Sequence, residues 1–443
     1  MKRLAVIISL LLLTSSLCLA RTWTDTKGRE VEADVIKVNP NRTAVFKTSS
    51  GKTVVVPFST FVAADIAYLE SLPTGKLHPA ESLPTGNLHA AERRLPLLGV
   101  TPYSEVSQKF YDKSGRAFNF LELAHHGGAN TTRVRYYGQN KDNTMRGLAK
   151  DGVEGNRILW DRMEIVKELG LRTVCTLMPS KPNVENRNFR VVLARIEKEA
   201  KESVQDFKKR GYELPKMYTI GNEINHGGMN DWCDNKVTPK LGDKGSRYYM
   251  TEILKAAARG LRAGGFRGYI GVHIDRTWAG FYHSIIEGGF TDWQVIAQSF
   301  YPRGKPNDTM ARQMERLHGI AKELDKKIFI METAAPYVLS GTPESRARSG
   351  HTGAQDFHPD FVREVSPQGQ AWHVEDMCEL LLDLPDERGL GLLTWGSDCT
   401  AGIHRFAIMT WNRAQVTKER VALPSIYSFG KYAEPLKSHK QTK

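Results

Sequence analysis

Two glutamates that each follow an apolar stretch are the residues of this sequence best suited to chemistry. Glu223 ends the stretch 216–223 and Glu332 lies near the end of 327–333. Two carboxyl groups can cleave a glycosidic bond, because one protonates the leaving oxygen while the other attacks or stabilises the anomeric carbon. We expect Glu223 to be the acid/base and Glu332 the nucleophile. A carboxyl separation of about 5–5.5 Å would make the cleavage a retaining one.

Other apolar stretches also end in polar or aromatic residues. Alone, each has an ordinary structural explanation, such as a core histidine, a salt bridge inside a barrel or a packed aromatic ring. Together they favour a pocket in which Arg133 and Tyr301 keep Glu332 ionised and Trp395 offers a flat face to a sugar. The expected substrate-binding residues are Arg133, Asn222, His273, Asp275, Tyr301 and Trp395, and Arg135 and Ser299 lie at strand ends beside them.

Eight apolar stretches with helical patterns between them predict an α/β fold, a parallel (β/α)8 TIM barrel. The expected strands are 97–100, 130–137, 171–178, 216–223, 268–275, 293–301, 327–333 and 389–395. The expected helices between them include 158–170, 194–211, 248–265, 309–325 and 369–384. In such barrels the reacting groups lie at the C-terminal ends of the strands, which is the rule that selects the residues above. No G-x-G-x-x-G follows a strand, so nothing indicates a dinucleotide-binding fold.

The chain divides into four parts. Residues 1–20 begin with basic residues, continue with an apolar run and end in a cleavage site with a small residue. This pattern predicts a cleaved signal peptide and therefore a secreted or periplasmic protein. Residues 71–94 hold an eleven-residue tandem copy rich in Pro and Gly, which indicates a linker. Residues 95–443 form the expected barrel. Alternating short strands in 21–70 predict a small SH3-like barrel, and the pattern W-T-D-x-x-G-R…V-P-F-S…D-x-x-Y-L resembles the SLA1 homology domain 1 family. That resemblance implies a peptide or protein partner.

Composition excludes several functional classes. The formal net charge is +13, but lysines and arginines alternate with acids, so we expect a solvated surface and no nucleic-acid partner. No stretch after residue 20 is apolar enough for a membrane span. Without ligand-spaced acidic or cysteine clusters, we expect no metal, calcium included, and no cofactor. Of the cysteines beyond residue 20, Cys233 and Cys399 are expected on one face of the fold and are the preferred disulfide pair.

Residues 97–400 resemble glycoside hydrolase family 53, the arabinogalactan endo-β-1,4-galactanases of the retaining clan A. The resemblance lies in segments that occur in the family's order: GV (99–100), FYD (110–112), NTTRVR (130–135), GNEIN (221–225), HID (273–275), SFYP (299–302), METAAP (331–336), SPQGQ (366–370) and GLGLLTW (389–395). It implies an acid/base at Glu223, a nucleophile at Glu332 and the six substrate-binding residues named above. It therefore implies a hydrolase that degrades a β-linked polysaccharide.

The chain departs from the family at three strand ends. Residues 176–182 (TLMPSKP) replace an aromatic and acidic segment, residues 226–232 (HGGMNDW) replace Leu-Trp-Pro, and Gly396 stands where the family has Glu. The substrate is therefore expected to be a β-glycan other than β-1,4-galactan, and basic residues in the loops suggest an acidic one: Lys181, Lys236, Arg276, Arg303 and Lys305. The competing interpretation is a non-catalytic carbohydrate-binding or scaffold protein on an inherited hydrolase barrel.

Overall fold

The structure is a computed structural model. It describes residues 21–39, 42–48, 52–62, 66, 75–76, 93–103, 106–138, 152–179, 189–226, 243–275, 277–301, 309–335, 365–396, 398, 415–417 and 420–436. The chain separates into two compact units, residues 1–87 and 88–443.

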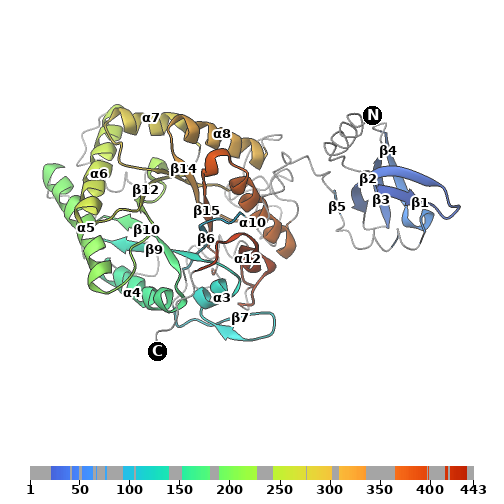
Figure 1. Cartoon of the computed structure of the whole chain (residues 1–443), viewed down its shortest axis with the longest axis horizontal. Coiled ribbons are helices and arrows are strands. Elements are labelled where there is room, and N and C mark those ends of the chain that lie inside the picture. The colour runs from blue at the N-terminus through green and yellow to red at the C-terminus, as the bar shows by residue number, and fades with distance from the viewer. Residues whose placement is uncertain are drawn as a thin grey trace, which may run out of the picture. The chain divides into compact units, whose positions relative to one another are not determined.

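The larger unit is a closed barrel of eight strands in which every neighbouring pair is parallel (Figure 1). The strands are β6 (Leu97–Thr101), β9 (Thr131–Tyr137), β10 (Arg172–Met178), β11 (Met217–Ile220), β12 (Tyr269–Ile274), β13 (Val295–Ser299), β14 (Lys327–Thr333) and β15 (Gly389–Trp395). They follow one another in chain order, and β15 closes the ring against β6. The predicted (β/α)8 barrel is confirmed.

Helices surround these strands (Figure 1). They are α3 (Phe120–His126), α4 (Gly152–Leu169), α5 (Phe189–Lys209), α6 (Asp243–Ala263), α7 (Ala279–Glu287), α8 (Met310–Glu323) and α10 (Pro367–Leu382). In α5, buried Val192, Ile196 and Val204 recur at helical spacing and form the face that packs inward. Side chains cap three of the helices: Asn119 caps α3, Thr309 caps α8 and Ser366 caps α10.

The interior of the barrel is apolar toward its N-terminal end. Nine buried side chains from six strands form one cluster there: Leu97, Val174, Met217, Val295, Ala297, Phe329, Met331, Leu390 and Leu393. Side chains alternate between the two faces of a strand, so the next outward-facing residues, such as Ile296 and Ile328, pack against the helices. The strands are buried on both faces, which explains their continuous apolar runs.

The smaller unit contains an antiparallel sheet of five strands. These are β1 (Arg21–Thr24), β2 (Glu30–Asn39), β3 (Thr43–Thr48), β4 (Thr53–Pro57) and β5 (Gly75–Lys76), in the order β1-β2-β3-β4 with β5 paired to β2. Its core holds Trp23, whose indole nitrogen donates to the backbone oxygen of Ala33 at 2.7 Å, together with Phe46 and Phe61. Short strands therefore form in the stretch 21–70 as expected, and β5 lies within the stretch expected to be a linker.

Several predictions fall outside the described residues. They concern the signal peptide (1–20), most of the linker (71–94) and the Cys233–Cys399 pair. Among the described cysteines, Cys175 and Cys378 are free and buried. In the part of the chain that the structure describes, no helix has the length and apolarity needed to cross a membrane.

Candidate active site

The two glutamates meet at the C-terminal end of the barrel. A carboxylate oxygen of Glu223 lies within 4.8 Å of one of Glu332, although the two residues come from β14 and from the turn after β11. Both belong to the end of the barrel where the strands stop and the loops begin. The strand-end rule therefore brings together the pair that the sequence singled out.

Two donors hold the side chain of Glu332, one at each carboxyl oxygen. Arg133 donates from Nη1 to Oε1 at 2.5 Å, and the Tyr301 hydroxyl donates to Oε2 at 3.0 Å. The Arg133 side chain is buried and also donates from Nε to Thr176 and from Nη2 to the side-chain oxygen of Asn222. The buried guanidinium thus connects the Glu332 carboxyl group to the turn that carries the other glutamate.

A break in strand register turns Glu332 into the barrel. Met331 belongs to the interior cluster, so simple alternation would point Glu332 outward toward the helices. The β13–β14 ladder shifts so that Ser299 pairs with Glu332, and the β14–β15 ladder shifts between Ile330 and Thr333. Such an irregularity re-aims a side chain, as bulges next to active sites do. Glu332 consequently faces Arg133.

The backbone that carries Glu223 is in a strained conformation. Gly221 has φ 76° and Glu223 has φ 46°, so a glutamate occupies the left-handed region that favours glycine. A conformation of this kind costs on the order of 1–3 kcal/mol and persists only where surrounding contacts hold it. Here the backbone N–H of Gly221 donates to Leu177 at 2.8 Å, which anchors the turn to β10.

Glu223, His273 and Ser299 form a closed ring of hydrogen bonds. Its backbone N–H donates to Nδ1 of His273 at 3.4 Å, and Nε2 of His273 is 3.0 Å from Oγ of Ser299. The Ser299 hydroxyl donates to Oε1 of Glu223 at 2.7 Å. Because Nδ1 accepts, the imidazole proton must sit on Nε2, and Ser299 is left free to donate to the carboxyl group. The ring fixes Oε1 as an acceptor, so a proton on Glu223 resides on Oε2.

Burial raises the pKa of Glu223, and the negative charge of Glu332 adds to the effect, so that the pKa rises from 4.5 to about 7. The hydrogen bond from Ser299 acts in the opposite direction. Burial also holds the pKa of His273 well below its usual range, and the charges of Arg133 and Arg135 lower it further. The His273 imidazole is therefore neutral near pH 7, whereas the pKa of the Glu223 carboxyl group lies near neutral pH.

The raised pKa of Glu223 lowers the stability of the folded protein above neutral pH, and we expect Glu223→Gln to restore the lost stability. The folded pKa is raised, so the folded state loses stability as pH rises from 4.5 through about 7. At pH 8 the variant should be more stable than the parent, by on the order of 2–3 kcal/mol in free energy of unfolding, whereas at pH 4 the two proteins should be equally stable. Urea unfolding at both pH values measures this. Exposed Glu315→Gln is the control, and an equal gain at both pH values would contradict the explanation.

An aromatic wall lies beside Glu332. The Trp395 ring packs edge-on against Tyr301, with 6.3 Å between centroids, and against Tyr103 at 6.0 Å. The indole nitrogen of Trp395 donates to the Tyr103 hydroxyl at 2.8 Å. Trp395 therefore packs against Tyr301, the residue whose hydroxyl donates to Glu332.

Asp275 has another partner. Its Oδ1 accepts from the amide of Asn225 at 2.7 Å, and its backbone N–H donates to the same side chain at 3.0 Å. The pair ties the short helix η3 (Ile224–His226) to the end of β12. Asp275 thus supports the segment after Glu223, although its negative charge still contributes to the raised pKa of that residue.

The sequence analysis missed two residues that the structure adds to this site. Tyr103 follows β6 and bonds Trp395, and Thr176 on β10 accepts from Arg133 at 2.9 Å. Both obey the strand-end rule, so applying it to the first and third strands would have found them. The basic loop residues expected to contact an acidic substrate all lie outside the described residues.

Metal binding fits this site poorly. Glu223, His273 and Glu332 do present ligand atoms within 4.8 Å of one another. However, the Arg133 guanidinium already occupies one oxygen of Glu332, and a bound cation would be repelled by it. Both imidazole nitrogens of His273 are also engaged, with Glu223 and with Ser299. The described groups favour proton transfer between carboxyl groups over metal coordination.

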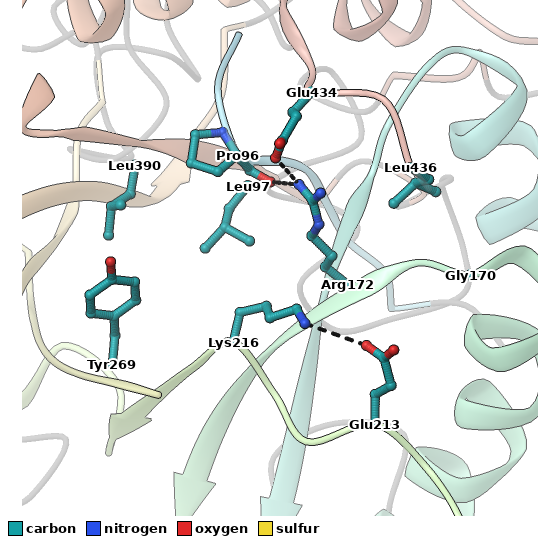
Figure 2. A pocket seen from close by; sticks show the side chains of 10 residues that line it. All are labelled: Pro96, Leu97, Gly170, Arg172, Glu213, Lys216, Tyr269, Leu390, Glu434 and Leu436. Atoms are coloured by element: carbon teal, nitrogen blue, oxygen red, sulfur yellow. Dashed lines mark hydrogen bonds and ion pairs between the residues drawn. The ribbon is translucent and has the colours of Figure 1, made fainter. Parts of the chain in front are cut away.

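A separate cavity of about 510 Å³ lies where the strands begin, at the opposite end of the barrel (Figure 2). Its two cationic side chains each face a carboxylate: Arg172 bonds Glu434 at 2.7 Å, and Lys216 bonds Glu213 at 3.4 Å. The N-terminal end of such barrels serves stability rather than chemistry. The cavity holds none of the active-site residues described above. Its Arg172–Glu434 pair connects β10 to the segment after α12 (Phe429–Tyr432), whereas Lys216 and Glu213 lie three residues apart in one segment.

Comparison with known proteins gives relatives with the same architecture. The catalytic domain of the family 53 glycoside hydrolase of Ignisphaera aggregans superimposes with a TM-score of 0.57 at 21% identity, over 76% of this chain and 96% of that one. One of two fungal β-1,4-galactanases also superimposes with a TM-score of 0.57, at 17% identity, over 76% of this chain and 99% of that one. At this level of sequence identity, the two superpositions show a shared fold.

The relatives found by sequence align with a smaller part of this chain. The arabinogalactan endo-β-1,4-galactanase of Thermothelomyces thermophilus is 23% identical over 193 residues, 41% of this chain and 51% of that protein. An uncharacterised protein of Niallia circulans is 24% identical over 191 residues, 41% of this chain and 49% of that protein. The chain thus spans about half the length of the curated relatives it matches.

The family model for glycosyl hydrolase family 53 matches residues 185–429, more than half of the chain. The protein therefore belongs to glycosyl hydrolase family 53.

Proposed function

We propose that this protein is a retaining glycoside hydrolase that cleaves β-glycosidic bonds in a polysaccharide. The observation that carries the proposal is the approach of the Glu223 and Glu332 carboxylate oxygens within 4.8 Å. Retaining glycosidases place their carboxyl groups ~5–5.5 Å apart, whereas inverting ones leave ~6.5–9.5 Å for a water molecule. The distance leaves no room for that water, which favours direct attack on the sugar.

In the first step, Glu332 attacks the anomeric carbon while the bond to the leaving oxygen breaks. That oxygen takes the proton from Oε2 of Glu223, and a covalent glycosyl-enzyme forms. In the second step, Glu223 removes a proton from a water molecule whose oxygen attacks the same carbon, and Glu332 leaves as a carboxylate. Two inversions restore the starting configuration. The pKa of about 7 suits Glu223 to give a proton and then take one back.

The remaining residues have positioning and binding roles in this proposal. Arg133 and Tyr301 hold both oxygens of Glu332, which orients the nucleophile. Asn222 accepts from Arg133 through its side-chain oxygen, so its amide hydrogens remain for the sugar 2-hydroxyl. Trp395 provides the stacking face. A protein that only bound carbohydrate would gain nothing from a buried carboxyl pair that lowers its stability, which weighs against the non-catalytic alternative.

Removal of the Ser299 hydroxyl should move the alkaline limit of activity to higher pH. Its hydrogen bond favours the ionised form of Glu223, so Ser299→Ala should raise the pKa of the acid/base by about one unit. The fall in kcat/KM above pH 7 should shift accordingly, while Ser299→Thr should restore the parent profile. Ser284→Ala on α7, where the hydroxyl bonds only the helix backbone, is the control. An unchanged pH profile for Ser299→Ala would argue against this role.

A panel of glycans tests the function itself. The full chain is incubated with β-1,4-galactan, β-1,4-glucan and β-1,3-glucan, and new reducing ends are measured. The Thermothelomyces relative makes β-1,4-galactan the first choice. NMR spectra recorded in the first minutes should show the β-anomer of the product. Release of the α-anomer would exclude retention, and an intact panel together with intact carboxylated and sulfated derivatives would exclude hydrolysis.

We further infer that the protein is exported and that residues 21–70 form an SH3-like module. The apolar start of the sequence supports export, since a basic end followed by an apolar run is typical of signal peptides. The antiparallel order of β1 to β4 and the aromatic core around Trp23 support the module. The adjacent exposed side chains of Val54 and Val55 on β4, 38% and 61% exposed, support a peptide or protein partner for this module.

A further inference from the structure

Tyr103 follows strand β6 at the mouth of the barrel, between residues of the two neighbouring strands. β6 is hydrogen-bonded to β15 on one side and to β9 on the other. Trp395 ends β15 and Arg135 lies on β9, so the two residues flank the tyrosine. The Tyr103 side chain is half-buried there. Tyr103 lies outside the segments that resemble the family, so the resemblance assigns it no role.

The Tyr103 hydroxyl accepts two hydrogen bonds and still has its own hydrogen to donate. Nη2 of Arg135 donates to it at 2.9 Å, and the indole nitrogen of Trp395 donates at 2.8 Å. A guanidinium and an indole N–H are donors only, so the direction of both hydrogen bonds is fixed. In the part of the chain that the structure describes, these are the two hydrogen bonds of this oxygen. The hydroxyl hydrogen therefore points to a third side, where no described group accepts it.

Contacts on several sides hold Tyr103 and leave the interior of the mouth as the open direction. Both oxygens of buried Asp398 accept its backbone N–H, at 2.9 Å each, which anchors the residue. The Arg135 guanidinium lies over the Tyr103 ring, 5.2 Å from the centroid, and Trp395 packs edge-on at 6.0 Å. Because the strands on both sides supply the two donors, the side of the hydroxyl that remains faces the axis of the barrel.

The surroundings make this hydroxyl a good donor that keeps its hydrogen. Desolvation raises the pKa of Tyr103, the charge of Arg135 acts in the opposite direction, and the charge of Glu332 raises the pKa again. The net shift is upward, so the hydroxyl stays protonated near neutral pH. Hydrogen bonds that an oxygen accepts polarise its own O–H, and one of the two donors here is charged. A hydrogen bond donated by Tyr103 is strengthened as a result.

We propose that Tyr103 binds the substrate, and that its hydroxyl donates a hydrogen bond to one hydroxyl oxygen of the sugar that stacks on Trp395. The inference rests on the proposed hydrolase function and specifies which sugar the same site accepts. A sugar whose face lies on the indole presents hydroxyl groups at its edge, and each of them offers an acceptor. A sugar without an oxygen at the contacted position would leave the Tyr103 hydrogen unpaired in a partly desolvated mouth. Tyr103 is then a determinant of specificity for one position of the sugar ring.

Monodeoxy substrates provide the test. The nitrophenyl β-galactoside and β-glucoside are each compared with analogues that lack one hydroxyl group, using the full chain and Tyr103→Phe. We expect Tyr103→Phe to lower kcat/KM roughly 5- to 15-fold more on glycosides that keep the contacted hydroxyl than on the one analogue that lacks it. The intrinsic reactivity of each analogue cancels in the ratio of parent to variant. Tyr111→Phe on β7 (Phe110–Tyr111), where the side chain is 38% exposed, is the control and should change no ratio.

The same comparison separates binding from a structural role. Tyr103→Phe also removes the acceptor of Arg135 and Trp395, and a displaced aromatic wall would lower kcat/KM by one common factor for every analogue. A common factor, or no change on any glycoside, would show that the inference is wrong, while the hydrolase function would stand. A loss that disappears for one analogue alone supports the hydrogen bond to the sugar.

A binding measurement distinguishes failure of this inference from failure of the proposed function. Calorimetry compares the affinities of Glu332→Gln and Glu332→Gln/Tyr103→Phe for the same glycosides without turnover. Equal affinity for one monodeoxy analogue, together with weaker binding of the other glycosides by the double variant, supports the inference even if the parent hydrolyses none of them. Equal weakening of all the glycosides, or none, contradicts it.

Discussion

Glu332→Gln should lower kcat/KM on the cleaved glycan by at least ~10⁴-fold, because the covalent route requires an ionised oxygen at this position. The loss should come from chemistry and not from unfolding. A glutamine keeps an acceptor for the buried Arg133 guanidinium and a group for Tyr301 to contact, so the buried charge is not left without a partner. Residual activity above about 1% of the parent value would show that Glu332 is not the nucleophile.

The stereochemistry of rescue identifies the role more directly. Glu332→Ala opens space beside the anomeric carbon, and added azide should restore cleavage of an activated aryl glycoside and yield a glycosyl azide of inverted configuration. Loss of the ion pair with Arg133 makes this variant less stable by ~3–5 kcal/mol, so circular dichroism has to verify that it is folded. Glu315→Gln on the exposed face of α8 should change neither the rate nor the product. A glycosyl azide of retained configuration would assign Glu332 the other role.

Glu223→Gln should lower kcat/KM on polysaccharide by ~10²–10⁴-fold, the range of a lost general acid. The decrease should shrink for aryl glycosides with good leaving groups, because these depart without a proton. The parent should lose activity as pH rises through about 7, since the raised pKa of Glu223 leaves the acid deprotonated above that value. This alkaline limb should be absent in the variant.

Rescue by azide distinguishes Glu223 from Glu332 here too. In a Glu223→Ala variant, azide should intercept the glycosyl-enzyme and give a product of retained configuration. The parent and Ser284→Ala serve as controls, as their water reaction is fast and no glycosyl azide should accumulate. If Glu223→Gln keeps both the parent rate on polysaccharide and its alkaline limb, the acid/base lies elsewhere in the mouth of the barrel.

Short-range patterns were sufficient to predict the barrel and most of its strand ends, although β11 ends at Ile220 rather than at residue 223 and β13 at Ser299 rather than at residue 301. Runs such as 327–333 are apolar on both faces, and the helices between them show helical periodicity, so both can be recognised without knowledge of their neighbours. Helix α7 was not among the helices named from the sequence, because its nine residues are mostly apolar and too few to show helical periodicity. The smaller unit follows the same logic, as its alternating strands are visible in the sequence.

The sequence by itself therefore determined which residues stand at the mouth of the barrel, since strand ends are a local property. Only the tertiary structure decided what they do there. Alternation would have turned Glu332 outward, and the register break beside Ser299 turns it inward. The hydrogen bond between Asp275 and Asn225 and the ion pair between Arg133 and Glu332 depend likewise on how the ring of strands closes. Distances between residues 50 to 200 positions apart are set by that closure, which no local pattern encodes.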